Sequence, residues 1–117
     1  EEHEKEDKVQ EIDMTRPQPC TKYRGAERIA WIAKLIEETD EVIQEAYTVS
    51  QIEQTNKKTP CEAMNEVMQE ARKRLAMELT DVKTLCESWL YADGWDEEQR
   101  GDLQRQVNEK NRERGRF

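Results

Sequence analysis

Apolar residues recur at helical spacing in two long stretches of this chain, followed by a shorter one. In the first stretch, about residues 25–54, one broad apolar face is made of Ile29, Ile32, Ala33, Ile36, Ile43, Ala46 and Tyr47, widened by Leu35, Val42 and Val49. Apolar positions three or four residues apart predict an amphipathic helix. Thr39 and Asp40 interrupt this face, so we expect a kink or short break there. Residues 55–58 are polar and predict a turn.

A second helix is predicted to begin at Thr59. Thr59 can cap its N-terminus, Pro60 suits its first position, and Glu62 completes a capping box. Its face consists of Val67, Met68, Ala71, Leu75, Leu79, Val82, Cys86, Trp89 and Leu90. Gly94 provides a left-handed stop.

A third, shorter helix is predicted from Asp96 to about Asn111. Asp96 and Gln99 have the spacing of an N-terminal cap, and the inner face carries only Leu103 and Val107. Residues 1–19, acidic and ending in two prolines, are expected to form a flexible arm. Residues 20–112 then make one helical domain, and residues 113–117 a frayed basic tail.

Composition supports an all-α fold. Charged residues are 39% of the 117, hydrophobic residues only 34%. Such a lean apolar supply favours helices with one buried stripe. We therefore expect a disulfide-linked antiparallel helical hairpin or bundle, with a short third helix and a fourth if the first stretch breaks.

The charge and the first residue suggest where the protein acts. A net charge of −8 argues against nucleic acid as the main partner, because phosphate binding needs a basic surface. No apolar run is long enough to predict a membrane span. The chain begins with Glu1 and not Met, which suggests a mature secreted protein; a cytosolic protein that lost its first methionine is the alternative.

Three cysteines leave one unpaired within the chain. In an antiparallel hairpin, Cys20 lies near Cys86, and this is the disulfide that we predict. Cys61 and Cys86 are separated by about 37 Å along one helix, too far to bond. Cys61 is then a free or intermolecular thiol, so the protein is a monomer or a Cys61-linked dimer. If the first helix folds back at Thr39, Cys20 can reach Cys61 instead.

The sequence offers no catalytic or metal site. The single histidine, His3, lies in the acidic arm, so the folded body has no Ser-His or Cys-His pair. Three cysteines at opposite helix ends do not form a tetrahedral metal site. We expect a protein that is not an enzyme and needs no cofactor.

Two features are candidates for partner binding. The first is an acidic segment, which consists of Glu37, Glu38, Asp40, Glu41 and Glu45. It is either a docking surface for a basic partner or a face neutralised by Arg72, Lys73 and Arg74 across the hairpin. The second is the aromatic pair Tyr91 and Trp95 near the end of the second helix, since Tyr and Trp are favoured interface anchors.

A different class of function is carriage of a small molecule. A pocket between the helices, lined by Met64, Met68 and Met77, would hold an apolar ligand. Methionines at this spacing more often fill gaps in a core.

Two stretches carry a resemblance to a known family. They are residues 30–38, Ala-Trp-Ile-Ala-Lys-Leu-Ile-Glu-Glu, and residues 86–91, Cys-Glu-Ser-Trp-Leu-Tyr. The chain resembles the albicin/anophensin family of anopheline mosquito salivary proteins, which are small, acidic, secreted, helical and disulfide-bonded. The resemblance implies an inhibitor of host plasma cascades. Such an inhibitor would bind the assembled C3 convertase of the alternative complement pathway, or factor XII and kininogen in contact activation.

Overall fold

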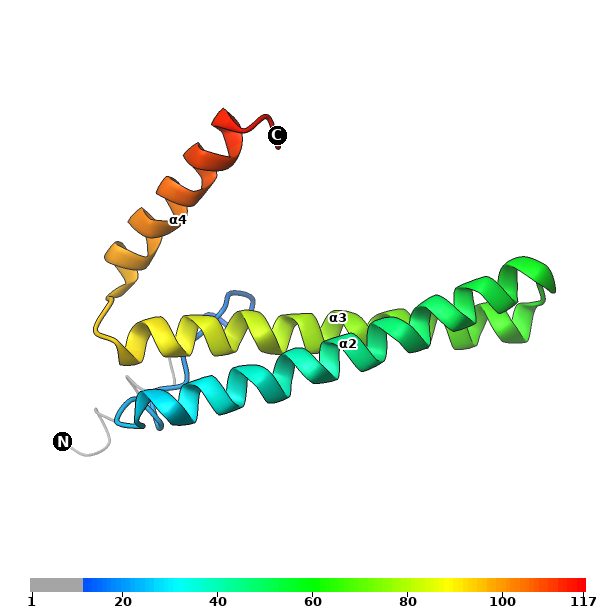
Figure 1. Cartoon of the computed structure of the whole chain (residues 1–117), viewed down its shortest axis with the longest axis horizontal. Coiled ribbons are helices and arrows are strands. Elements are labelled where there is room, and N and C mark those ends of the chain that lie inside the picture. Colours follow the sequence, from blue (N-terminus) through cyan, green and yellow to red (C-terminus); the bar gives the residue numbers. More distant parts are fainter. Residues whose placement is uncertain (1–11) are drawn as a thin grey trace. The chain divides into compact units, whose positions relative to one another are not determined.

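A computed structural model describes residues 12–117 (Figure 1). Three helices account for most of this range: α2 (Arg28–Lys58), α3 (Glu62–Ala92) and α4 (Glu97–Glu113). No strand occurs between residues 12 and 117. The all-helical prediction is confirmed.

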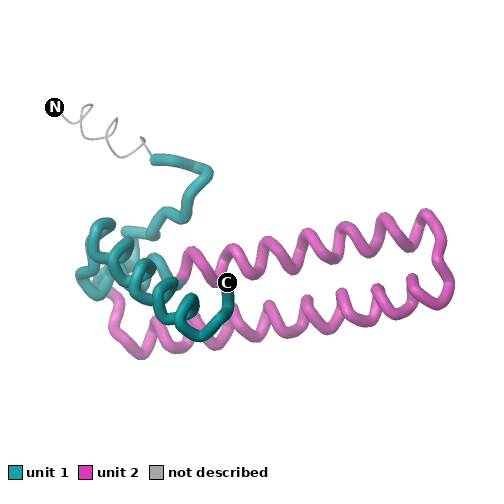
Figure 2. The backbone as a smooth tube through the Cα atoms, turned by 90° about the horizontal axis from the view of Figure 1, so that it is seen from above, with its two compact units in different colours: residues 1–25, 86–117 teal, residues 26–85 magenta. Residues whose placement is uncertain are grey.

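The chain divides into two compact units, shown in different colours in Figure 2. One unit is Ala26–Leu85, in which α2 and most of α3 form an antiparallel hairpin. The other combines the residues up to Gly25 with Cys86–Phe117. The single domain over residues 20–112 stays a prediction.

The hairpin buries a different face of α2 from the one that the apolar pattern emphasises. Trp31 and Val49 are buried on α2, and Met68 and Ala71 on α3. Ala71 is fully buried, with no exposed surface. The isoleucines of the predicted face are instead exposed; Ile36, for example, is 64% exposed. The inward face instead includes Leu35, Val42 and Val49, which were expected only to widen the predicted apolar face.

Helix α2 is longer and less interrupted than predicted. It runs unbroken through Thr39, whose hydroxyl donates a 2.7 Å hydrogen bond to the Leu35 carbonyl and so stays within the helix. The predicted turn at residues 55–58 is wrong, because these residues form the last helical turn. Lys57 and Lys58 lie there, where positive charge is favourable at a helix C-terminus.

Thr59 ends α2, and the prediction that it caps the next helix is wrong. Its backbone N–H donates to the Thr55 carbonyl at 3.0 Å, and Pro60 disfavours helical geometry at the residue before it. Helix α3 begins at Glu62. The N–H of Met64 donates to the Cys61 sulfur at 3.4 Å, so Cys61 occupies the capping position.

The join between α3 and α4 agrees with the sequence. Gly94 has a φ of 94°, a left-handed conformation that side chains disfavour. The Asp96 carboxylate accepts from the Gln99 N–H at 2.8 Å, while the Gln99 side chain accepts from the Asp96 N–H at 2.9 Å. The predicted capping box is confirmed, and α4 continues to Glu113, two residues beyond its expected end.

Of the predicted acidic arm, residues 1–11 lie outside the described residues. Asp13 accepts hydrogen bonds from the backbone and hydroxyl of Thr15, at 2.9 and 2.6 Å, which forms a local turn. Arg16 pairs with Glu97 at 3.3 Å. The Cys20 N–H donates to the Ser88 hydroxyl at 2.8 Å, and Ser88 is buried. These contacts hold the segment against α4 and the last turns of α3, which belong to the same unit.

Candidate functional site

The acidic segment occupies consecutive turns around the middle of α2. Lys34 forms ion pairs with Glu37 at 3.5 Å and with Glu38 at 3.3 Å. The Glu38 side chain is only 15% exposed, whereas that of Glu37 is 60% exposed. Asp40 is exposed and accepts a 2.7 Å hydrogen bond from Gln44. The segment therefore presents Glu37 and Asp40 to solvent and turns Glu38 toward the hairpin.

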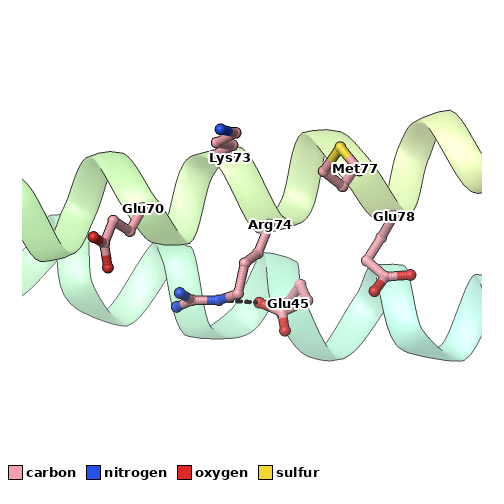
Figure 3. Close-up of a pocket in the computed structure, with 6 residues that line it drawn as sticks. All are labelled: Glu45, Glu70, Lys73, Arg74, Met77 and Glu78. Atoms are coloured by element: carbon pink, nitrogen blue, oxygen red, sulfur yellow. Dashed lines mark ion pairs between the residues drawn. The ribbon is translucent and has the colours of Figure 1, made fainter.

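Neutralisation across the hairpin is partial. Arg74 on α3 pairs with Glu45 at 3.7 Å, as Figure 3 shows. Arg72, which was expected to face the same segment, instead binds Glu53 through its Nε at 3.0 Å. Of the five acids, Glu45 is thus the one with a described ion pair to α3.

Glu78, on α3, faces Glu38 and Glu41 of the acidic segment. Carboxylate oxygens of Glu38, Glu41 and Glu78 all lie within 4.8 Å of one another. A hydrogen bond with Glu78 is the main reason that the pKa of Glu41 is raised, and burial and repulsion from Glu38 add to it. Two carboxyl groups this close share a proton more readily than they both ionise.

The same cluster has the oxygen ligands that a hard cation such as Ca²⁺ prefers. With one oxygen from each residue, three carboxylates supply fewer than the six to eight oxygens of a typical calcium site, and the remaining ligands would have to come from second carboxylate oxygens or water. The hydrogen bond between Glu41 and Glu78 that raises the pKa of Glu41 accounts for the closeness of these two carboxyl groups without a cation. The expectation of no metal site stays a prediction.

A hollow of about 420 Å³ lies beside the segment (Figure 3). Its lining consists of Glu45, Glu70, Lys73, Arg74, Met77 and Glu78. Five of these six side chains are charged, which contrasts with the apolar lining of small-molecule sites. Of the three methionines predicted to line a ligand pocket, only Met77 reaches this hollow, while Met68 is buried in the hairpin core.

The aromatic pair lies in the other unit, around Arg100. The Arg100 guanidinium stacks 5.9 Å from the centre of the Tyr91 ring and donates to the Trp95 carbonyl at 2.7 Å. It also pairs with Glu87 at 3.0 Å, and its side chain is only 10% exposed. Tyr91 accepts a further 3.3 Å hydrogen bond from Arg24. Trp95 remains 41% exposed, so it is the more available of the two predicted anchors.

All three cysteines, Cys20, Cys61 and Cys86, are exposed free thiols. The bond between Cys20 and Ser88 places Cys20 beside the turn of α3 that contains Cys86. Residues two apart point to different sides of a helix, so Ser88 faces Cys20 and Cys86 does not. The predicted disulfide stays a prediction.

Two residues that matter to these surfaces were missed from the sequence. Glu78 was overlooked because its neighbours, Glu38 and Glu41, come from another helix, and only the hairpin register brings the three together. Arg100 was overlooked because it follows two acids, Glu97 and Glu98, in the first turn of α4. A cation near a helix N-terminus is unfavourable because it opposes the helix dipole. The position of Arg100 in the sequence therefore indicates that a nearby acid, such as Glu87, stabilises it.

Comparisons with known proteins complete the description. No protein-family model, curated protein or solved structure matches this chain. Among the helices of residues 12–117, none has the length and apolar character needed to cross a membrane.

Proposed function

We propose that this protein is a secreted inhibitor that binds a host defence protease complex. The preferred target is the assembled C3 convertase of the alternative complement pathway, as the resemblance to the albicin/anophensin family implies. The protein acts by binding, without catalysis or a cofactor. Its rigid hairpin presents one charged face to a large partner.

The observation that carries the proposal is that the five acids of the acidic segment have only two described cationic partners, Lys34 on α2 and Arg74 on α3. Only Glu45 has a described ion pair to α3, and Glu37 and Asp40 remain open to solvent. Such a negative surface steers a basic partner and sets its orientation. Trp95, 41% exposed, supplies an aromatic anchor elsewhere on the protein.

The test is lysis of rabbit erythrocytes in serum with magnesium as the only divalent cation, a condition that isolates the alternative pathway. We expect the protein to prevent lysis, and Glu37→Lys/Asp40→Lys to lose at least about tenfold in potency if both charges face the partner. A matched control, Glu66→Lys/Asp81→Lys, makes the same charge change at exposed positions on α3. Normal lysis at micromolar protein would reject the complement target.

Contact activation is the alternative target, because factor XII and kininogen would meet the same negative surface. A clotting assay triggered by kaolin separates the two: prolonged clotting with normal lysis identifies contact activation. Carriage of a small apolar ligand is a third hypothesis, disfavoured by the charged lining of the hollow. Native mass spectrometry tests it, since a carrier should retain a bound ligand.

The disulfide belongs to the same proposal. We expect Cys20 and Cys86 to pair in the secreted protein, because the Cys20 N–H donates to the hydroxyl of Ser88, which is two residues from Cys86 along α3. Closing so long a loop would stabilise the fold by about 4 kcal/mol. Peptide mapping without reduction is decisive: a Cys20–Cys61 or Cys61–Cys86 peptide would contradict this pairing.

A further inference from the structure

Helix α2 has two apolar faces, and only one of them is packed. The inward face is formed by Trp31, Leu35, Val42 and Val49, which are buried or half-buried. The outward face is an isoleucine stripe, which we define as Ile29, Ile32, Ile36, Ile43 and Tyr47. These five side chains are 67, 41, 64, 53 and 68% exposed, respectively.

The isoleucine stripe is narrow, and Thr39 and Asp40 interrupt it once, between Ile36 and Ile43. At about 100° per residue, its five positions fall within an arc of about 60°, and its centre is about 110° from that of the inward face. The stripe therefore does not belong to the packing of α2 on α3. From Ile29 to Tyr47 the stripe covers 19 residues, which corresponds to about 27 Å along the helix.

The spacing is that of a helix-pairing seam. Ile29, Ile36 and Ile43 are seven residues apart, and Ile32 lies between the first two. A seven-residue apolar repeat is the pattern by which one helix packs along another. Isolated exposed apolar residues need no explanation, whereas an ordered row of them marks an interaction site.

The rest of the described chain offers no second helix that matches this seam. Helix α3 already occupies the inward face of α2. Helix α4 carries only Leu103 and Val107 as large apolar residues. A second α2 supplies an identical row of isoleucines.

The area available is sufficient for a pair of such helices. With each side chain between two-fifths and two-thirds exposed, two copies offer on the order of 1,000 Å² of apolar surface, about the minimum for a specific interface. We propose that a second copy of this chain packs its α2 against the isoleucine stripe, giving a non-covalent homodimer. The proposal of this dimer rests neither on the inhibitor function nor on any bond through Cys61.

Charge limits the strength of this dimer. Each chain carries a net charge of −8, and Asp40 lies at the edge of the stripe between Ile36 and Ile43. Both features oppose association. A small interface with this repulsion implies a dissociation constant in the micromolar range.

Sedimentation velocity tests the proposal, from about 5 to about 500 µM, a range that spans micromolar affinity. A reductant is present throughout so that thiols contribute nothing. We expect the wild-type protein to change from monomer to dimer across this range, and Ile36→Lys/Ile43→Lys to stay a monomer. The exposed substitutions should not unfold the helix, because Lys is a better helix former than Ile. They also make the chain less negative, so greater charge repulsion cannot explain a lost dimer.

The matched control is Met77→Lys, which changes a 59% exposed apolar side chain of α3 to the same residue. It should dimerise as the wild type does, and circular dichroism should show equal helix content in all three proteins. If the lysine variant loses helix, Ile36→Gln/Ile43→Gln replaces it. A wild type that stays a monomer throughout overturns the proposal. So does a stripe variant that dimerises normally, or a Met77 variant that fails as the stripe variant does.

Discussion

The corner between α3 and α4 and the middle of the α2–α3 hairpin use charge in opposite ways. At the corner, Arg100 contacts an acid, an aromatic ring and a backbone carbonyl within a few residues of one another. In the middle of the hairpin, Glu41 and Glu78 bring two acids together, and the pKa of Glu41 is raised as a result.

The difference suggests two roles: the charges at the corner stabilise the fold, whereas those in the middle of the hairpin are available to bind a partner. A guanidinium that is 10% exposed, with two hydrogen bonds and a ring contact, fixes the direction of the chain, and it has little left to offer a partner. Acids that repel one another, such as Glu41 and Glu38, destabilise the isolated hairpin slightly, and a basic partner would relieve that repulsion. Positions that cost stability in the free protein are frequent at functional sites.

The largest effect should come from Arg100→Met at the corner. This change removes the hydrogen bond to Trp95 and leaves the carboxylate of Glu87, 30% exposed, without its cation. We expect a loss of about 2 kcal/mol in the free energy of unfolding. Urea denaturation measures it. Arg105→Met, at an exposed guanidinium that pairs with Asp102 and Glu109, is the control and should cost much less. Equal losses in the two variants would show that Arg100 does not fix the corner.

A smaller effect is expected from the backbone of the same corner. Gly94→Ala forces a side chain into a φ of 94° and should destabilise the protein by about 1 kcal/mol. Gly101→Ala lies inside α4 with nothing within 4 Å of the added methyl group, so it should stabilise by about 0.5–1 kcal/mol. Thermal unfolding followed by circular dichroism compares the two. A stabilising Gly94→Ala would mean that the corner is not held in this conformation.

The corner could be predicted from the sequence better than the hairpin could. Gly94, Asp96 and Gln99 act through neighbours in the chain, so local patterns were enough to identify the stop and the cap. The Thr59 cap failed because two rules competed at one residue, and the effect of Pro60 on the preceding backbone prevailed. Helix stops and caps can be predicted from the local sequence where a single rule applies to the residue.

The hairpin surfaces depend on register, which local patterns do not provide. Both apolar faces of α2 were visible as one broad face, yet only packing against α3 shows that Trp31 points inward and Ile36 outward. The acidic segment was found from the sequence, but its partners were only partly right, because Arg74 reaches Glu45 while Arg72 binds Glu53. Glu78 could be placed only by the structure.

Glu41→Gln should have the smallest effect on stability. It tests the repulsion between acids in the middle of the hairpin. The pKa of Glu41 in the folded protein is raised above its ordinary value of 4.5 by the hydrogen bond to Glu78. The folded state therefore binds this proton more tightly than the unfolded state, and stability falls as the pH rises from about 4.5 through the folded-state pKa. Glutamine keeps a hydrogen-bond donor but has no charge to lose. We expect the variant to be more stable than the wild type at pH 7.5 and about equal to it at pH 4.5.

Thermal unfolding midpoints between these two pH values test this. Within this window, Asp13 and Asp102 do not interfere, because hydrogen bonds lower the pKa of each below 3.8, so both remain charged. Glu66→Gln removes one negative charge from an exposed position on α3 and controls for net charge. A stabilisation that is the same at both pH values, or that Glu66→Gln reproduces, would show that Glu41 and Glu78 do not share a proton. If the gain is confined to neutral pH, the middle of the hairpin holds the repulsion that a basic partner would relieve, in contrast to the satisfied charges around Arg100.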